Sequence, residues 1–212
     1  MDTYRLQEEI HKVVNEKLCE GMTEIQLADV ITSVCPLWQG DIISGERSAE
    51  IEGPPTERVI QNGDVVLLDL QVCVGGVWSD LTRVYFVGSM SPKQREAFDK
   101  VAGAIRIGEK MLKPGLVVSE LWHSMRNAID SEFAFNHHGG HRIGVTDIVA
   151  EPRFVPECGD VLCEGMTVTL EPAIYFPGEF GIRLENNYLI TSDGARRLCS
   201  LSMKPDDFIV KG

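Results

Sequence analysis

The stretch that decides the fold is Asp64-Val-Val-Leu-Leu-Asp-Leu-Gln-Val-Cys-Val74. Its β-branched residues predict a strand, and Gly75-Gly76 predicts a turn that leads into a second strand over residues 77–87. This hairpin places Asp69 inside an apolar run and Asp80 eleven positions later, across the turn. Two residues at this spacing can lie opposite each other on one face of the hairpin.

Helical patterns precede and follow the hairpin. Four helices are expected, over residues 4–20, 24–34, 92–112 and 119–133. The stretch from Thr23 to Gln26 reads as a capping box, and Ser91 with Pro92 reads as a second helix start. Residues 36–62 are rich in glycine and proline, so they predict a loop.

A second hairpin repeats the first one near the end of the chain. Strands are expected over residues 166–175 and 181–191, separated by the turn Pro177-Gly178-Glu179. Each strand contains one glutamate among apolar residues, Glu171 and Glu185. Helices that flank a largely antiparallel sheet predict an α+β fold, and the length of the chain favours a single domain over residues 1–212.

The net charge and composition of the chain disfavour several classes of binding partner and favour one cellular compartment. The formal net charge is -12, which disfavours binding to nucleic acid and to anionic membranes, because both attract basic surfaces. The N-terminal sequence does not have the pattern of a secretory signal, and no apolar run is long enough to predict a transmembrane helix. The six scattered cysteines predict reduced thiols, which favours a cytoplasmic location.

Four acids within apolar strands carry the functional argument. They are Asp69, Asp80, Glu171 and Glu185. Charged carboxylates are costly to bury, so something must neutralise them. Arg83 and Arg183 lie nearby in the sequence and could form salt bridges. Divalent cations would neutralise the four acids better than arginines, because each cation supplies two charges and accepts several oxygen ligands.

His141 is the expected fifth ligand. Gly139-Gly140 before it and Gly144 after it allow the backbone to approach a crowded centre. Four carboxylates and one imidazole suit two divalent ions such as manganese, cobalt, iron or zinc. A pair of such ions supports hydrolytic chemistry.

Five motifs together resemble those of the pita-bread metallopeptidases, a family that includes methionine aminopeptidase, Xaa-Pro aminopeptidase and prolidase. The motifs are Asn62-Gly-Asp-Val-Val-Leu-Leu-Asp69, Ser79-Asp-Leu-Thr-Arg83, Gly140-His-Arg-Ile-Gly144, Leu170-Glu-Pro-Ala-Ile-Tyr175 and Gly181-Ile-Arg-Leu-Glu185. The resemblance implies two pseudo-symmetric halves around a curved antiparallel sheet. It also implies a catalytic domain without the N-terminal domain of longer family members.

The resemblance also implies a role for each ligand. Asp69 would chelate one ion, and Asp80 and Glu185 would bridge both. His141 and Glu171 would complete the other ion, and Glu171 would be the base that takes a proton from the nucleophilic water. The implied substrate is a small peptide or amide, with the Xaa-Pro branch most similar, and a homodimer is an open alternative to a monomer.

The sequence departs from the family pattern at two histidines that help to bind substrate. Glu52 stands where a loop histidine is usual, and the residues 148–152 contain no second histidine. Glu52, His138 and Arg183 are the candidate substrate-binding residues. Glu52 would favour a cationic group, and His138 would approach the substrate from a new direction, although His137 and His138 could instead only shape a loop.

Three hypotheses follow from these observations. The first is a hydrolase that uses two metal ions to cleave a peptide or amide C–N bond, with Glu171 and His141 in catalysis. The second is a metalloenzyme on the same scaffold with a non-peptide substrate, which the two absent histidines favour. The third is a catalytically silent binding module, which would usually lose metal ligands, whereas this sequence retains all five.

Overall fold

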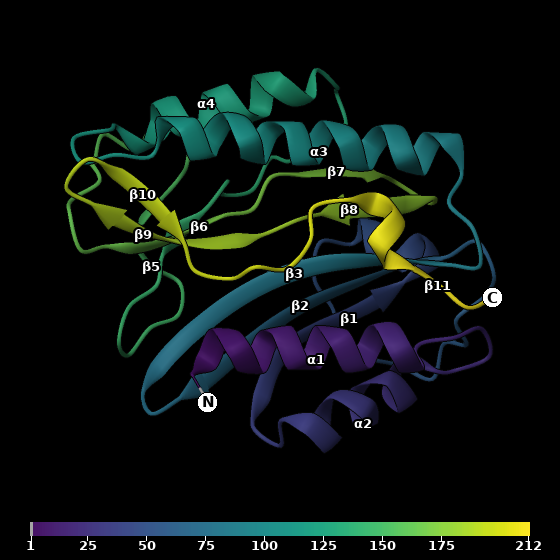
Figure 1. Ribbon diagram of the computed structural model, residues 1–212. Coiled ribbons are helices and arrows are strands. Elements are labelled where there is room, and N and C mark those ends of the chain that lie inside the picture. Colours follow the sequence, from purple (N-terminus) through teal and green to yellow (C-terminus); the bar gives the residue numbers. More distant parts are fainter. Residues whose placement is uncertain (1) are drawn as a thin grey trace.

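The computed structural model describes residues 2–212 and places the strands between two pairs of helices. One pair is α1 (Thr3–Lys17) and α2 (Glu24–Val34), and the other is α3 (Pro92–Met111) and α4 (Val118–Ile129). Figure 1 shows the two pairs on opposite sides of the strands, with α3 and α4 above and α1 and α2 below. Each half of the chain thus contributes two helices and then a hairpin, as the predicted pseudo-symmetry requires.

The deciding hairpin forms as predicted. It consists of β2 (Val65–Val74) and β3 (Val77–Val87), which pair antiparallel. With β1 (Trp38–Ser44) and β11 (Ile209–Val210) they make a sheet in the order β1-β2-β3-β11. The register pairs Asp69 with Thr82 and Gln71 with Asp80. The two aspartates are therefore diagonal neighbours on one face, and the expectation that they lie directly opposite each other is wrong.

The two strands expected near the end of the chain are each broken in two. The structure has β6 (Thr167–Leu170), β7 (Ala173–Phe176), β8 (Phe180–Arg183) and β9 (Asn186–Thr191). The breaks fall at Glu171 and Glu185, where the chain leaves one sheet for another. At these breaks the backbone N–H of Glu171 donates to the Gly139 carbonyl, and that of Glu185 donates to the Thr82 carbonyl. The strand breaks therefore point both glutamates toward the middle of the molecule.

The remaining strands complete two further sheets. Their bounds are β4 (His141–Arg142), β5 (Ala150–Arg153) and β10 (Gly194–Arg197). One sheet has the order β10-β9-β6-β4-β5, and β7 pairs with β8 in the other. Apart from the two residues of β11, which run parallel to β3, the paired strands are antiparallel. The α+β prediction is confirmed.

The loop expected over residues 36–62 is in part wrong. Its first half forms β1 and a short 3-10 helix over Gly45–Ala49, which place residues 38–49 beside β2. Gly40 permits this pairing, because a Cβ at that position would lie 1.9 Å from the Asp69 carbonyl oxygen. The glycine that favours a loop in the sequence is thus needed for close strand contact.

The helices begin at the predicted caps. The predicted capping box of Thr23 and Gln26 forms, and Ser91, predicted as a helix start, makes a second capping box with Gln94. The last helix ends at Ile129, earlier than expected, because Asp130 adopts a left-handed conformation with φ 45°. None of the helices described is both long enough and apolar enough to span a membrane. Within residues 2–212, all six cysteines are free thiols.

Candidate metal centre

A cavity of about 420 Å³ lies where β2 and β3 meet the breaks between β6 and β7 and between β8 and β9. It is lined by all five residues proposed as ligands and by the three proposed to bind substrate. The lining residues are Asp41, Glu50, Ile51, Glu52, Asp69, Gln71, Asp80, His137, His138, His141, Val149, Glu171, Arg183 and Glu185. The fold therefore brings together every candidate site residue, although they are far apart in the sequence.

Three of the candidate ligands converge at the buried end of the cavity. One ligand atom each from Asp80, His141 and Glu185 lies within 4.8 Å of the others. His141 Nε2 is 3.5 Å from Asp80 Oδ2 and 3.6 Å from Glu171 Oε1. These separations are longer than hydrogen bonds and suit atoms that share an ion.

Buried oxygens without partners test whether cations fit this site. Among the described residues, Asp69 Oδ1, Asp80 Oδ1 and Glu185 Oε1 are buried and have no hydrogen-bond partner. An unsatisfied buried carboxylate oxygen is costly, and a divalent cation removes that cost by accepting the oxygen as a ligand. The donor set, oxygens with one imidazole, suits manganese, cobalt, iron or zinc.

The neighbours of His141 orient its ring for such a role. Its Nδ1 lies 3.1 Å from the Arg142 carbonyl oxygen and donates to it, so Nε2 is the nitrogen that faces Asp80 and Glu171 and that can bind a metal once its proton leaves. Gly140 makes this placement possible. A Cβ there would lie 2.3 Å from the Thr169 carbonyl oxygen and 2.7 Å from the Phe154 ring.

Burial and mutual repulsion keep the acids of the metal-free site from all being ionised. Burial and the charge of Asp69 raise the pKa of Asp80 to about 7. Burial and the charges of Asp80 and Glu171 raise the pKa of Glu185 well above its usual range. In the absence of cations Glu185 therefore holds a proton at neutral pH and Asp80 is about half protonated, so a bound cation would displace protons from both.

Unlike Asp80 and Glu185, the side chains of Glu171 and His141 are stabilised in their charged forms. Burial opposes the ionisation of Glu171, yet the nearby imidazoles, His138 foremost, lower its pKa to about 2. Burial alone would lower the pKa of His141, but its contact with Asp80 and the charge of Glu171 raise it to about 9. Glu171 therefore stays ionised at neutral pH.

Arg183 pairs with one of the acids, as the alternative reading of the sequence anticipated. Its Nη2 donates to Asp69 Oδ2 at 2.7 Å, and its Nη1 donates to the Tyr175 hydroxyl at 2.8 Å and to the Ile51 carbonyl at 2.7 Å. Its Nε donates to Thr82 Oγ1 at 3.2 Å. One arginine thus neutralises Asp69 in part, and the other three acids are left without a guanidinium.

Arg83, the other arginine considered, does not contact the acids' side chains. It donates to the carbonyls of Thr82 and Glu185 and to Asn186 Oδ1, and its burial lowers its pKa to about 10. It therefore fixes the backbone on either side of the centre.

The sequence analysis missed Thr169 and gave Tyr175, which ends one of the quoted motifs, no role in positioning the site. Tyr175 links Arg183 to His137, whose Nε2 is 3.1 Å from the Tyr175 hydroxyl. Thr169 accepts from the His141 backbone N–H and donates to Glu171 Oε1 at 3.2 Å. Both follow the pattern of ordinary strand residues, so only their place in the fold reveals them.

The open end of the cavity is acidic. Asp41, Glu50 and Glu52 line it, and burial together with the charge of Asp69 raises the pKa of Asp41. Ile51 has an unusual φ of 69° for a β-branched residue, and this conformation directs its carbonyl to Arg183. The segment that carries Glu52 is thereby held against the centre.

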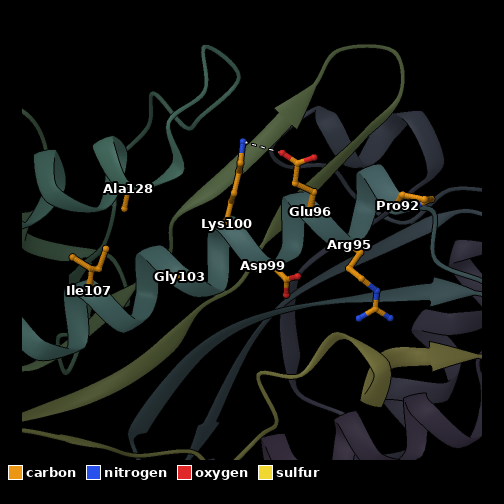
Figure 2. Close-up of a pocket in the computed structure, with 8 residues that line it drawn as sticks. All are labelled: Pro92, Arg95, Glu96, Asp99, Lys100, Gly103, Ile107 and Ala128. Atoms are coloured by element: carbon orange, nitrogen blue, oxygen red, sulfur yellow. Dashed lines mark ion pairs between the residues drawn. The ribbon is translucent and has the colours of Figure 1, made fainter.

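A second hollow, of about 590 Å³, lies along the outer side of α3. Figure 2 shows that its labelled side chains, apart from Ala128 of α4, spread along α3 and point in different directions. Lys100 and Glu96 form an ion pair of 3.2 Å with each other. This hollow lacks a set of converging donor atoms, so we do not assign it a chemical role.

The fold and the cavity define a class of protein, an α+β scaffold with carboxylates and imidazoles gathered where its sheets meet. The sequence model of a family described as "Metallopeptidase family M24" matches residues 2–192 of this chain. The chain belongs to this family, and the resemblance seen in the sequence is confirmed.

Similar proteins cover nearly the whole chain. The Xaa-Pro dipeptidase of Pyrococcus horikoshii is 35% identical over 194 residues, which are 86% of this chain and 55% of that protein. The dipeptidase PepE of Mycobacterium ulcerans superposes with a TM-score of 0.92 at 27% identity, covering 99% of this chain and 58% of that one. The prolidase of Pyrococcus furiosus gives 0.89 at 32% identity, over 94% and 62%. The expected pita-bread fold is confirmed, and this chain spans little more than half the length of these relatives.

Proposed function

We propose that this chain is a hydrolase that uses divalent metal ions to cleave the C–N bond of a peptide or related amide, in the manner of an Xaa-Pro peptidase. The observation that carries the proposal is the set of partnerless carboxylate oxygens of Asp69, Asp80 and Glu185 in one cavity. Family membership and similarity to an Xaa-Pro dipeptidase and a prolidase support the same reaction class.

Two divalent ions would be held by Asp69, Asp80, His141, Glu171 and Glu185. When bound, such ions polarise a carbonyl oxygen and lower the pKa of water. Manganese, cobalt, iron and zinc all suit the donor set.

The cytoplasm remains the predicted compartment, supported by the free thiols, and the homodimer rests on family resemblance alone.

Glu171 is the proposed general base. It stays ionised at neutral pH, and its Oε1 faces the cavity beside His138 and His141. Thr169 donates to the same oxygen and limits its movement. An ionised, positioned carboxylate can take a proton from water and later return it to the leaving amine.

Glu52 and His138 are the proposed substrate contacts. Both line the cavity, and Glu52 brings a negative charge to its open end. Arg183 was expected to join them. We propose instead that it positions the site, because Asp69, Tyr175, Ile51 and Thr82 already accept four hydrogen bonds from its guanidinium.

Hydrolysis of a panel of Xaa-Pro dipeptides and longer Xaa-Pro peptides, with manganese or cobalt, tests the proposal. We expect turnover that chelation abolishes and that Glu171→Gln reduces by about 10²-fold or more, the usual contribution of a general base. Glu179→Gln is the matched control, since Glu179 is exposed and pairs with Lys93 away from the cavity. Full activity of Glu171→Gln would refute the assignment of the base.

A non-peptide substrate is the second candidate function. It is favoured by Glu52 at the cavity, where family peptidases usually place a loop histidine, and by the lack of a second histidine in residues 148–152, of which Val149 lines the cavity. A protein that binds metal but cleaves none of the peptides would support this candidate. A protein that binds no metal would support the silent binding module instead.

A further inference from the structure

His138 lies at the cavity with a nitrogen that none of the predicted roles uses. It is three residues before His141, in the segment between α4 and β4. Its side chain is 27% exposed, but its Nδ1 is buried and has no hydrogen-bond partner among the described residues. A buried ring nitrogen without a partner is costly, and a ligand bound to this nitrogen would remove that cost.

The distance between His138 and the Glu171 carboxylate is informative. Nδ1 is 3.1 Å from Glu171 Oε1, yet the contact lacks the direction of a hydrogen bond. Two atoms that share an ion point at a common third position rather than at each other. With metal–ligand bonds of about 2.0–2.2 Å, such atoms lie roughly 3–3.5 Å apart.

A second imidazole nitrogen lies near Glu171 Oε1, at a distance just beyond the upper end of this range. His141 Nε2 is 3.6 Å from the same Glu171 oxygen, and the His138 and His141 rings lie 5.5 Å apart between centroids. His138, His137 and Glu171 also offer ligand atoms within 4.8 Å of one another. Glu171 Oε1 thus has an imidazole nitrogen on each side.

His137 is occupied and does not compete for this role. Its Nδ1 donates to the His138 carbonyl, 2.6 Å away, and its Nε2 accepts from the Tyr175 hydroxyl. Both nitrogens are therefore used within the protein. The bond to the His138 carbonyl also fixes the backbone that carries the His138 ring.

We propose that His138 Nδ1 is a further metal ligand, bound to the ion that His141 and Glu171 hold. This inference rests on the proposed function, because it requires that the cavity binds metal. It assigns the ligand role to a side chain otherwise expected only to contact substrate. A second imidazole also favours metals that accept nitrogen well, such as cobalt and zinc, over manganese.

Ring-nitrogen NMR of ¹⁵N-labelled protein titrated with zinc, a diamagnetic ion, tests the proposal directly. The chain has five histidines, so each ring can be assigned from single variants. We expect His138 Nδ1 and His141 Nε2 to shift into the range of metal-bound nitrogens together. A shift of His141 alone would overturn the His138 proposal and leave the proposed function standing. No shift of either ring would overturn both.

Metal affinity gives a second measurement on the whole chain. His138→Gln should raise the dissociation constant for cobalt about tenfold or more, and that for manganese by less. His123→Gln is the control, because His123 is exposed and contacts the Pro156 carbonyl outside the cavity. Equal affinities of the two variants for cobalt would contradict the proposal.

Discussion

Asp80 and Glu185 show at the level of single residues why this site calls for cations. Each is buried, and each carries an oxygen without a partner. Their raised pKa values mean that the metal-free protein tolerates them only by holding protons. The same oxygens would serve as ligands once the protons leave.

Metal binding should therefore release protons and strengthen as the pH rises. Below about pH 7 Asp80 is protonated, and His141, with a pKa of about 9, also holds a proton that a metal must displace. We expect affinity to increase from pH 5.5 to 8. Calorimetry in buffers of different ionisation enthalpy measures the released protons. Binding without proton release at pH 6 would show that the acids are already ionised.

Arg183 offers a second test at the residue scale. Arg183→Met would leave Asp69 without its cation, and breaking a buried ion pair costs about 3–5 kcal/mol. We expect the lower end of this range, since Asp69 is partly exposed. Urea unfolding of the metal-free protein measures the change.

Arg153→Met is the matched control for that experiment. Arg153 is exposed and lies 3.8 Å from Glu151, so its loss should change the free energy of unfolding by less than about 0.5 kcal/mol. If both variants unfold at the same urea concentration, Arg183 does not stabilise the site as described.

At the scale of secondary structure, the site is built where strands end or change partners. Glu171 follows the end of β6, Glu185 lies between β8 and β9, and diagonal positions of the β2–β3 hairpin supply Asp69 and Asp80. Strand pairing alone would point alternate side chains away from one another. The breaks let residues from three sheets face one cavity.

Gly140 tests whether this close approach is needed. Gly140→Ala would push the chain away from the Thr169 carbonyl and the Phe154 ring. This shift would move the neighbouring His141 away from Asp80 and Glu171. We expect a destabilised protein with at least about tenfold weaker metal binding. Gly159→Ala is the control, because a Cβ there meets nothing within 4 Å. Unchanged metal affinity in Gly140→Ala would contradict this account of the glycine.

The elements that the sequence predicts well are those whose signals are local. The capping boxes and the Gly75-Gly76 turn depend on residues a few positions apart, and all of them form. β1 was missed because Gly40 favours a loop in the sequence alone. Its need for close contact with the Asp69 backbone is visible only in the folded structure. The strand breaks at the glutamates were missed because the flanking apolar residues continue the pattern without interruption.

Some residues of the site can likewise be identified from the sequence, whereas others are revealed only by the structure. The candidate ligands are visible in the sequence because acids are unusual in apolar strands, and the fold brings them to one cavity. The link from Asp69 through Arg183 and Tyr175 to His137 depends on contacts between distant segments. A sequence without its fold contains no signal for such a link.

At the scale of the whole molecule, one apolar core joins the two halves. It includes Ile10 of α1, Val84 of β3, Val101 of α3 and Val168 of β6. A shared core of this kind predicts a single cooperative unfolding transition, as the single-domain interpretation requires.

Two tryptophan variants check that prediction. Trp122→Phe leaves fluorescence from Trp38 and Trp78 in the first half, and the double variant Trp38→Phe/Trp78→Phe leaves Trp122 in the second. Within each protein, fluorescence and far-ultraviolet circular dichroism should give the same midpoint. A tryptophan signal that changes at a different midpoint from the circular dichroism would indicate two independently unfolding parts.

The central claim is that the cavity acids hold divalent ions. An anomalous difference map from a crystal soaked in manganese measures this most directly. We predict two peaks, each in contact with carboxylates among Asp69, Asp80, Glu171 and Glu185, and one of them beside His141 Nε2. A map without a peak in this cavity, from protein that is folded and fully soaked, would contradict the account.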